Sequence, residues 1–396
     1  MARAPASANA SREPLLEGVG AADAALGEVF GVLACEHIRI LADVGAIGAA
    51  RPIEEGQYQP ASLDLRLGPK AYRVRASFLP GRRRSVEALL SEFTYDEISL
   101  EGAGAVLERG CVYVIPLLET LRLPKGVSAV ANPKSSTGRL DIFTRLITND
   151  TEIFDHVAEG YQGPLFAEVS PRSFSVRVRQ GSRLDQMRFR RRAPLASALD
   201  FILPDAALRT EHERAPLVDG ELTLRDGLIL RVALEALGAG DVVGYRAQKH
   251  TDVVDVDRVD HYGVEDYWEK LHARPGRKLI LDPGDFYILA SRERIRIPSH
   301  LSAEMVAIDP AMGEFRVHYA GFFDPGFGYA AGGRPGSRAV LEVRSHEVPF
   351  ILEDGQVIGR LVYETMAAEP AALYGHGGFS NYQGQELKLS KHFKAP

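Results

Sequence analysis

Cysteine is scarce in this chain of 396 residues, with Cys35 and Cys111 as its only two thiols. So few thiols exclude a framework of disulfides and fit a protein of a reducing compartment. The sequence also lacks an apolar run of the about 18–20 residues that a membrane-spanning helix needs. Residues 1–11 lack the charged start and long apolar stretch of a secretory signal. We therefore expect a cytoplasmic protein with no membrane partner.

Two common phosphate-binding signatures are missing as well. No Gly-rich loop is followed by Lys and then Ser or Thr, which excludes a P-loop phosphotransferase. The stretch Gly238-Ala-Gly240 lacks the rest of a dinucleotide-binding fingerprint, so we interpret it as a turn.

Positive charge is not in excess, because 47 Lys and Arg residues stand against 53 Asp and Glu residues and give a formal net charge of -6. Such a balance provides no basic stripe for a nucleic-acid polymer, although it leaves room for a small anion site. The short basic runs Arg82–Arg84 and Arg190–Arg192 are interpreted as solvated loop charges.

What the sequence does contain is an internal repeat of domain size. Several residues recur at a constant offset of 174 positions, in register across a segment of each half. The matching pairs are Gly110 and Gly284, Pro124 and Pro298, Glu168 and Glu342, and Gly181 and Gly355. Because this period is too long for a solenoid repeat, it indicates two homologous domains.

The local pattern is typical of β structure. Leucines alternate with polar residues over 63–67, and apolar residues do the same over 174–178, as in half-buried strands. Short strands between Gly, Pro and Asp turns predict a mainly β fold of two sandwich or barrel domains. A few short helices are expected, at Cys35–Ile47 and Val264–Leu271. We predict a disordered lead-in over 1–28, domains over 29–195 and 221–396, and a linker over 196–220 that contains Pro204 and Pro216.

Three stretches carry candidate chemistry. Lys134-Ser135-Ser136-Thr137-Gly138-Arg139 presents hydroxyls and cations that suit phosphate oxygens, although a capped turn explains it equally well. Ala320-Gly-Phe-Phe-Asp324-Pro-Gly-Phe327 is a turn whose aromatic residues belong either to the core or to a pocket wall. Glu342 lies on an apolar strand, like Glu168 in the first half. Burial would raise the pKa of Glu342 and suit it to proton transfer, whereas alternation alone allows it to face solvent.

Together these stretches resemble the dCTP deaminases, which share their fold with the trimeric dUTPases. The family carries an Arg-Ser-Ser-x-x-Arg stretch, an Asp-Pro-Gly-Phe loop, a strand with a catalytic glutamate, and a C-terminal Ser-Lys-Tyr-Gln-Gly-Gln segment. The matching residues here are Lys134-Ser135-Ser136-x-x-Arg139, Ala320 to Phe327, Leu341-Glu342-Val343, Tyr374, and Ser380 to Gln385, with Gln59 to Gly68 similar to an early strand. The resemblance is closest to the long, internally duplicated form.

The resemblance implies two tandem dUTPase-like domains that deaminate dCTP to dUTP and ammonia, feeding dUMP and dTTP synthesis. It implies that Glu342 acts as general base and then acid, while Ser135 and Arg139 hold the water and stabilise the intermediate. The residues implied in substrate binding are Lys134, Ser136, Ala320, Asp324, Phe327, Tyr374, Tyr382 and Gln383. Two alternatives stay open: a bifunctional enzyme that releases dUMP and pyrophosphate, and a non-catalytic nucleotide-binding module.

Zinc is not expected, because the zinc nucleobase deaminases need a His-x-Glu and a Pro-Cys-x-x-Cys element. Here Cys35 and Cys111 lie 76 positions apart. The resemblance implies Mg²⁺ only through the substrate triphosphate. It further implies dTTP as a possible feedback inhibitor and assembly into a homo-oligomer.

Each half lacks a motif that the other half keeps. The first half has the Ser-Ser-x-x-Arg stretch but reads Ala158-Glu-Gly-Tyr-Gln in place of the Asp-Pro-Gly-Phe loop, and the second half has the opposite loss. We therefore predict one site that combines Ser135–Arg139 with Ala320–Glu342, within one chain or between chains. Lys134 stands in place of an Arg and Asn381 in place of a Lys, which removes phosphate-binding capacity unless other cations offset it.

Overall fold

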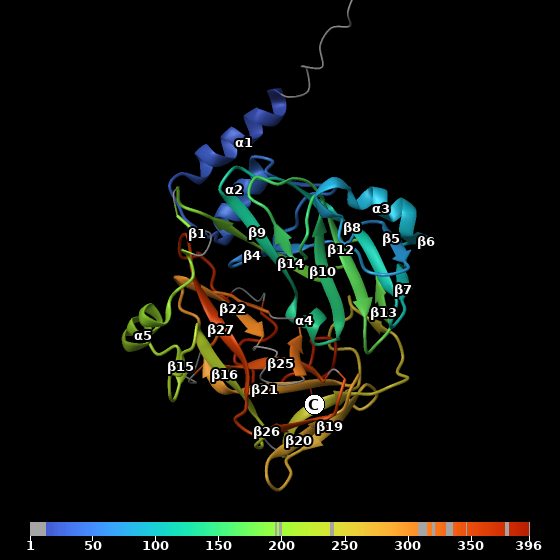
Figure 1. Cartoon of the computed structure of the whole chain (residues 1–396), viewed down its shortest axis with the longest axis vertical. Coiled ribbons are helices and arrows are strands. Elements are labelled where there is room, and N and C mark those ends of the chain that lie inside the picture. Colours follow the sequence, from blue (N-terminus) through green and yellow to red (C-terminus); the bar gives the residue numbers. More distant parts are fainter. Residues whose placement is uncertain are drawn as a thin grey trace, which may run out of the picture.

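The computed structural model describes residues 13–194, 196–197, 200–237, 241–307, 315–318, 321–329, 336–345, 347–376 and 380–395. Strands dominate this part of the chain and the helices are short, so the prediction of a mainly β fold is confirmed (Figure 1). Its α-helices are α1 Glu13–Leu26, α2 Cys35–Asp43, α3 Val86–Phe93, α4 Ser135–Gly138 and α5 Asp205–Arg214. Short 3₁₀ turns cover Glu55–Gln57 and Gly81–Arg83.

The first half of the chain forms two curled sheets. One has the order β11-β9-β14-β4-β3 with β1 beside β14, and the other has the order β10-β12-β8-β5-β6 with β2 beside β8. Their strands are β1 Gly31–Val32, β2 Ile47–Ala49, β3 Tyr58–Gln59, β4 Ser62–Leu65, β5 Lys70–Val74, β6 Thr94–Ser99, β8 Val112–Arg122, β9 Val127–Pro133, β10 Ile142–Thr148, β11 His156–Val157, β12 Gln162–Pro171 and β14 Asp185–Arg191.

The second half forms a large branched sheet and a two-stranded ribbon. The sheet follows β19-β17-β21-β16-β27-β22-β24, with β15 and β25 beside β21 and β23 beside β25, while β20 pairs with β26. These strands are β15 Val218–Asp219, β16 Leu228–Ala233, β17 Val242–Ala247, β19 Trp268–His272, β20 Lys278–Leu281, β21 Phe286–Ile295, β22 Leu301–Ala307, β23 Phe315–His318, β24 Phe322–Phe323, β25 Ser337–Ser345, β26 Phe350–Glu353 and β27 Val357–Thr365.

The same strand pairs recur in both halves at the offset of the sequence repeat. The first residues of β9 and β22, Val127 and Leu301, are 174 positions apart. β9 pairs with β14 as β22 pairs with β27, and β8 pairs with β12 as β21 pairs with β25. Glu168 on β12 and Glu342 on β25 therefore hold equivalent places in their sheets.

The two halves contact each other through paired strands and a shared core. β18 (Val254–Asp255) runs parallel to β13 (Val176–Val178), which also pairs with β7 (Ala105–Leu107). One hydrophobic core fills the first half and extends across this junction to Trp268 and Phe393, and a second core fills the second half. Phe393 stacks edge-on against Trp268, so the end of the chain is anchored in the interior.

The predicted helix over Val264–Leu271 is wrong. The backbone makes a single helical turn, in which Trp268 N donates to Val264 O, and then continues as strand β19. Val264, Tyr267 and Trp268 are buried in the core, which explains their helix-like spacing. The helix predicted over Cys35–Ile47 exists as α2, but it ends at Asp43 and Ile47 already belongs to β2.

Three other interpretations of polar or terminal segments also need correction. Residues 13–26, predicted within a disordered lead-in, form α1, and the predicted linker contains α5, whose Leu208 is fully buried. The strand at 63–67 is buried on both faces, because Asp64 pairs with Lys134 and Arg66 pairs with Glu119.

Among the helices of the described residues, none is long and apolar enough to cross a membrane.

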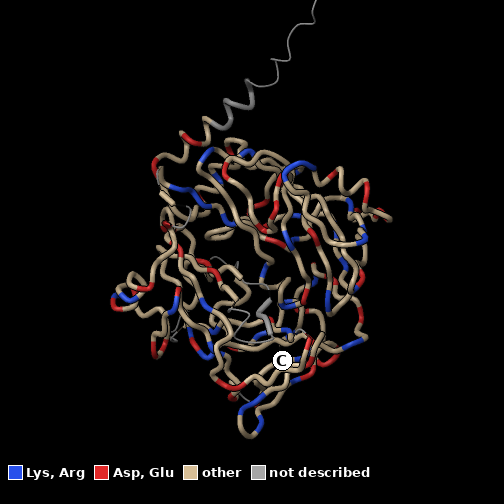
Figure 2. Tube along the Cα trace, in the orientation of Figure 1, with Lys and Arg blue, Asp and Glu red and all other residues tan. Residues whose placement is uncertain are grey.

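The basic run at 190–192 is not a solvated loop, as the sequence had indicated. Arg190 and Arg191 lie on β14, where Arg190 pairs with Glu304 and Glu364 across the junction between the halves. Along the part of the trace that is coloured in Figure 2, Lys and Arg are interspersed with Asp and Glu, without a large region of one sign. That mixture agrees with the near balance of charges in the sequence.

Candidate active site

Residues of both halves line one cleft, among them residues of α4 in the first half and of β25 in the second half. In Figure 1, α4 is drawn above β25 where the two halves meet. The cleft encloses about 870 Å³ of space, part of which is open to solvent. Its lining residues are Gln59, Lys134, Ser135, Ser136, Arg139, Gln186, Met305, Gly321, Phe322, Phe323, Asp324, Phe327, Val340, Glu342, Tyr374, Asn381, Tyr382 and Gln385. The structure thus brings the two predicted segments together within one chain.

The turn α4 directs the polar side chains of the first half into this cleft. The carbonyl of Lys134 accepts hydrogen bonds from Thr137 N and Gly138 N, and Ser135 O accepts from Arg139 N, which closes one helical turn after strand β9. Lys134 Nζ pairs with the buried carboxylate of Asp64. Within the described part of the chain the hydroxyl of Ser135 has no hydrogen-bond partner, so it is available to a reactant.

Arg139 is held rigidly although it is a long side chain. Its Nη1 donates to Lys388 O at 2.9 Å, its Nη2 donates to Gln385 Oε1 at 2.8 Å, and its guanidinium lies 3.9 Å from the centre of the Tyr382 ring. All three partners belong to the C-terminal segment. The remaining donor, Nε, is buried and has no hydrogen-bond partner among the described residues.

Glu342 faces that free donor from β25. Its side chain is buried, and Oε1 lies 3.9 Å from Arg139 Nε, which is too long for a hydrogen bond. Burial raises the pKa of Glu342 to about 8, because the low-dielectric surroundings disfavour the carboxylate more than the charge of Arg139 favours it. A carboxyl group with this pKa can accept a proton and return it near neutral pH.

The equivalent glutamate of the first half has a different environment. Glu168 is also buried, but Arg145, its cross-strand neighbour on β10, donates from Nε to Glu168 Oε1 at 3.0 Å. Arg145 in turn lies 3.5 Å above the Phe154 ring. Arg145 thus occupies Oε1 of Glu168 with two charge-assisted hydrogen bonds, whereas no guanidinium nitrogen is within hydrogen-bond distance of Glu342 among the described residues.

Aromatic side chains form the opposite wall of the cleft. Phe323 and Phe327 pack edge to face with centroids 5.1 Å apart, and Phe327 contacts Tyr374 at 5.5 Å. The turn Asp324-Pro-Gly holds them in place, and Gly326 has a φ of 94° where a side chain would collide with Leu373. Burial raises the pKa of Tyr374 to about 12. These three aromatic rings, which are inclined to one another, give this side of the cleft an apolar surface of the kind that small-molecule pockets use.

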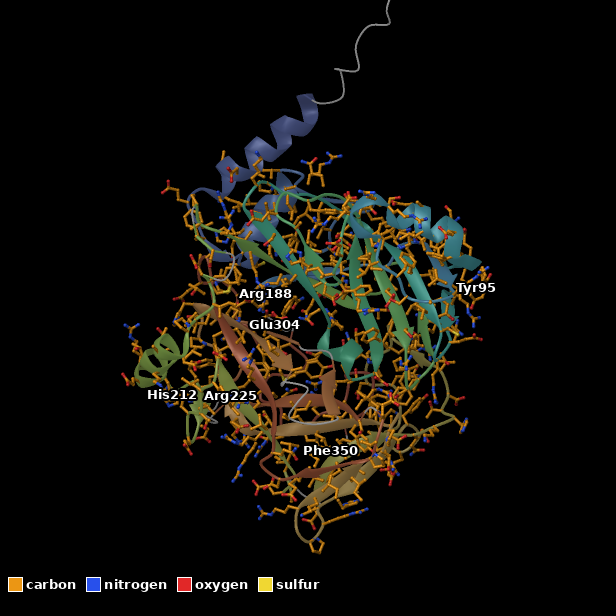
Figure 3. All side chains as sticks on the ribbon, viewed as in Figure 1. Tyr95, Arg188, His212, Arg225, Glu304 and Phe350 are labelled. Atoms are coloured by element: carbon orange, nitrogen blue, oxygen red, sulfur yellow. The ribbon has the colours of Figure 1, made fainter. Side chains whose placement is uncertain are left out.

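Arg188 of the first half packs against the aromatic residues of the Asp324 loop. It is fully buried, its guanidinium stacks 4.1 Å from the Phe322 ring, and Nη2 lies 3.4 Å from Asp324 Oδ1. Nη1 donates to Ala303 O at 3.0 Å and lies 3.2 Å from Glu364 Oε2. Figure 3 places Arg188 and Glu304 at the boundary between the two halves. An arginine of the first half therefore fixes the Asp324 loop of the second half.

Most of the predicted site residues line the cleft, with two exceptions. Gln383 points away from it and donates to Gly326 O and Tyr374 O, so it joins the Asp324 loop to the C-terminal segment. Ala320 and residues 330–335 of the Gly-rich insertion lie outside the described residues. Tyr382 is buried in the cleft, where its ring contacts Arg139 and its hydroxyl accepts from Lys391 N at 3.1 Å.

Several lining residues were not predicted. Three of them lie inside motifs that the sequence analysis recognised, but no role was predicted for these residues: Gln385, Phe322 and Phe323. In the structure Gln385 accepts a hydrogen bond from Arg139. Gln186 and Met305 carry no local signal, because β14 and β22 bring them to the cleft only through tertiary pairing. Among the described residues, no group of three or more His, Cys, Asp and Glu side chains is arranged to hold a metal ion.

The fold and the cleft define a two-part β protein with a buried carboxyl group of raised pKa in a cleft that aromatic side chains also line. Comparison with known families agrees with this description. Residues 29–193 match the model for the N-terminal domain of 2'-deoxycytidine 5'-triphosphate deaminase, and residues 204–393 match the model for its C-terminal domain. The chain belongs to the dCTP deaminase family, whose members are enzymes.

Individual relatives show the same relationship. A crystal structure of 2'-deoxycytidine 5'-triphosphate deaminase from Agrobacterium tumefaciens is 52% identical, covers 86% of this chain and all of its own, and superposes with a TM-score of 0.81. The dCTP deaminase of Natronomonas pharaonis is 26% identical over 195 residues, 47% of this chain and 91% of the relative. The dUMP-forming dCTP deaminase of Methanobrevibacter smithii is 28% identical over 137 residues, 34% of this chain and 66% of the relative.

Proposed function

We propose that this protein hydrolyses dCTP to dUTP and ammonia without a zinc ion. The observation that carries the proposal is the pair of Glu342 and Arg139, a buried carboxyl group of raised pKa that faces an unpaired guanidinium N–H. The family match supplies the substrate class, and the distance between the two cysteines in the sequence argues against a zinc site.

In the proposed reaction, Glu342 takes a proton from a water molecule as that water adds to C4 of the cytosine ring. Glu342 gives this proton to ring N3, then takes the proton of the new C4 hydroxyl and passes it to the amino group, which leaves as ammonia while the C4 carbonyl forms, so Glu342 ends each cycle in its starting state. Arg139 Nε–H and the Ser135 hydroxyl, neither of which has a hydrogen-bond partner among the described residues, stabilise the charge that develops in the tetrahedral intermediate.

The roles proposed for the remaining lining residues rest on the resemblance of their motifs to the family, and these residues line the same cleft. We propose that Phe327 and Asp324 border the deoxyribose, that Lys134 and Ser136 contact phosphate oxygens, and that Tyr374 and Tyr382 enclose the nucleotide. Mg²⁺ enters with the triphosphate of the substrate, which it partly neutralises. dTTP is proposed as an inhibitor because it offers the same sugar and triphosphate to the cleft.

The names of several relatives favour a second candidate, in which the product is dUMP and pyrophosphate. The dUMP-forming dCTP deaminases of Methanobrevibacter smithii and Halobacterium salinarum match 34% and 33% of this chain. The Agrobacterium tumefaciens protein, which covers far more of it, is named only as the deaminase.

Product analysis separates the candidates. When the purified protein is incubated with dCTP and Mg²⁺, we expect dUTP and ammonia to accumulate in equal amounts, as measured by anion-exchange chromatography and an ammonia assay. Appearance of dUMP with pyrophosphate would establish the bifunctional reaction, and absence of ammonia would overturn both enzymatic proposals in favour of a binding module.

The pH dependence of the reaction follows from the raised pKa of Glu342. Below about pH 8 the carboxyl group of Glu342 is mostly protonated in the free enzyme, and in that form it cannot accept a proton from water. We expect kcat/KM for dCTP to rise about tenfold per pH unit up to about pH 8 and then to level off. A profile that is flat between pH 6 and pH 8 would show that Glu342 is ionised in that range and would contradict the assignment.

A further inference from the structure

Two pairs of opposite charge join the end of α4 to β25, and they differ in geometry. On β25, Glu342 and Arg344 are two positions apart, so their side chains lie on the same face of the strand. Just past α4, Arg139 and Asp141 are also two positions apart. Arg139 faces Glu342 at 3.9 Å without a hydrogen bond, whereas Arg344 forms a direct ion pair with Asp141. A loose pair at the reacting carboxyl group therefore lies next to a tight pair.

The tight pair is a two-pronged contact in a buried place. Arg344 Nη2 donates to Asp141 Oδ2, and Arg344 Nε donates to Asp141 Oδ1 at 3.2 Å. Arg344 Nη1 donates to Gly284 O at 2.8 Å. Asp141 is fully buried, and Ser173 Oγ donates to its Oδ2 at 2.6 Å. A planar guanidinium that is bonded to a carboxylate at two points fixes the orientation of the two segments as well as their distance.

The backbone around Asp141 joins this contact to the turn that carries Arg139. Asp141 has a φ of 56°, in the left-handed region that Asp adopts more readily than most residues. Its N–H donates to Gly138 O at 2.8 Å, which closes the turn after α4, and its carbonyl accepts from Arg172 N at 2.9 Å. Because Asp141 and Arg139 belong to one hydrogen-bonded turn, a shift of one displaces the other.

The first half of the chain lacks this arrangement. At the offset of 174 positions, Ser170 takes the place of Arg344 beside Glu168, the glutamate that is bonded to Arg145. Ser170 is buried, and its hydroxyl has no hydrogen-bond partner among the described residues. The arginine therefore stands beside the glutamate that lines the cleft and is replaced beside the one that does not.

The charge of Asp141 also reaches Glu342. Burial is the largest cause of the raised pKa of Glu342, the positive charge of Arg139 opposes it, and the negative charge of Asp141 adds to it. A carboxylate without a nearby cation raises the pKa of its neighbour further. By pairing with Asp141, Arg344 limits this effect.

We propose that the ion pair of Asp141 and Arg344 positions the two reacting segments, α4 and β25, so that the catalytic arginine and glutamate face each other without forming a hydrogen bond. Without the pair, the segments are free to close until the arginine bonds to the glutamate, as Arg145 does to Glu168. This inference rests on the proposed function, because it concerns the alignment of the groups that carry out that reaction. It makes Asp141 and Arg344 positioning residues.

The first test compares Arg344→Met and Arg344→Lys with the wild type and with Arg179→Met. Arg179 joins the halves by the same two-pronged contact, to Asp255 at 2.7 and 2.6 Å, but does not line the cleft. In an ammonia-release assay with dCTP we expect Arg344→Met to lower kcat about 10–100-fold and to change KM much less. Arg344→Lys should lower kcat by a smaller factor, because it keeps the charge but not the planar fork. Arg179→Met should keep the wild-type kcat.

The second test measures how the pair acts on Glu342 without turnover. An infrared pH titration of the carboxyl band that disappears in Glu342→Gln gives the pKa of this side chain. We expect that pKa to rise in Arg344→Met, which leaves the charge of Asp141 less neutralised, and to fall in Asp141→Asn, which removes it. Asn also tolerates the left-handed backbone. Two other titratable residues near Glu342 are the same in all variants, Tyr382 and its cross-strand neighbour His318.

The outcomes separate this inference from the proposed function. If the wild type releases no ammonia, the proposed function fails, while the infrared titration still shows whether the pair acts on Glu342. The inference is overturned if Arg344→Met keeps the wild-type kcat, or if Arg179→Met loses the same factor. Should Arg344→Met fail to fold, an unchanged kcat in Arg344→Lys overturns it. It is equally overturned if the pKa of Glu342 is the same in the wild type, Arg344→Met and Asp141→Asn.

Discussion

Glu342→Gln is expected to lower kcat for dCTP deamination by about 10²–10⁴-fold while leaving the affinity for dCTP nearly unchanged. The amide keeps the shape of the side chain and fits a site in which Glu342 is uncharged below about pH 8. It cannot accept a proton from water, however, so the chemical step is lost. Rapid-mixing or steady-state ammonia assays measure the rate, and equilibrium binding of dCTP measures the affinity.

Glu168→Gln is the matched control, because it makes the same change at the equivalent place in the first half. It removes the carboxylate that Arg145 holds, so some stability is lost, but the folded protein should keep its turnover. If Glu168→Gln abolishes turnover and Glu342→Gln does not, the assignment of the base is reversed.

The same Glu342 variant should be more stable than the wild type at alkaline pH. A carboxyl group whose pKa is raised from 4.5 to about 8 in the folded state stabilises the fold fully below pH 4.5 and loses that contribution as the pH rises to 8. Glutamine has no proton to lose. Its advantage in urea unfolding should therefore be absent near pH 4.5 and grow up to about pH 8, which also shows that the inactive variant is folded.

Arg188→Met is expected to reduce the free energy of unfolding by about 3–5 kcal/mol, since it leaves Asp324 and Glu364 buried with fewer partners. The burial that already raises the pKa of Asp324 would no longer be opposed by this guanidinium. Urea denaturation monitored by circular dichroism measures the loss. The KM for dCTP should rise as well, because the aromatic wall depends on the same contact.

Two further variants make this result specific. Arg82→Met removes an arginine whose pairing with Glu152 is exposed, so its cost should stay within about 0–1 kcal/mol. Arg188→Met combined with Asp324→Asn should recover part of the stability, because a neutral amide does not need the guanidinium. Equal losses in Arg188→Met and Arg82→Met would contradict the role given to Arg188.

The sequence was informative wherever a motif or a repeat was carried by neighbouring residues. The offset of 174 positions is matched by equivalent strands, and the polar turn at Ser135–Arg139 and the strand of Glu342 lie on one cleft as predicted. Within the tail motif Tyr382 lines the cleft, whereas the turn that follows it directs Gln383 to the Asp324 loop and Gln385 to Arg139.

What the sequence did not reveal depends on contacts between distant segments. Arg190 was interpreted as a solvated charge and Arg188 received no role, but in the structure carboxylates of the second half pair with both arginines of β14. Asp64 alternates with leucines, a pattern that places a residue on the solvent side of a strand. In the structure Asp64 is buried and forms an ion pair with Lys134. The helix-like spacing at Val264–Leu271 reflects burial of one turn and not a helix, because the residues that follow pair with β17 as strand β19.

The position of α4 and β25 in one polypeptide has a consequence for how the site forms. Ser135, Arg139 and Glu342 meet without an encounter between separate molecules, so their effective concentration is set by the chain that joins the halves. Assembly of the reacting groups is thus a folding event and obeys unimolecular kinetics. Dilution, which separates the partners of a site shared between subunits, leaves this one intact.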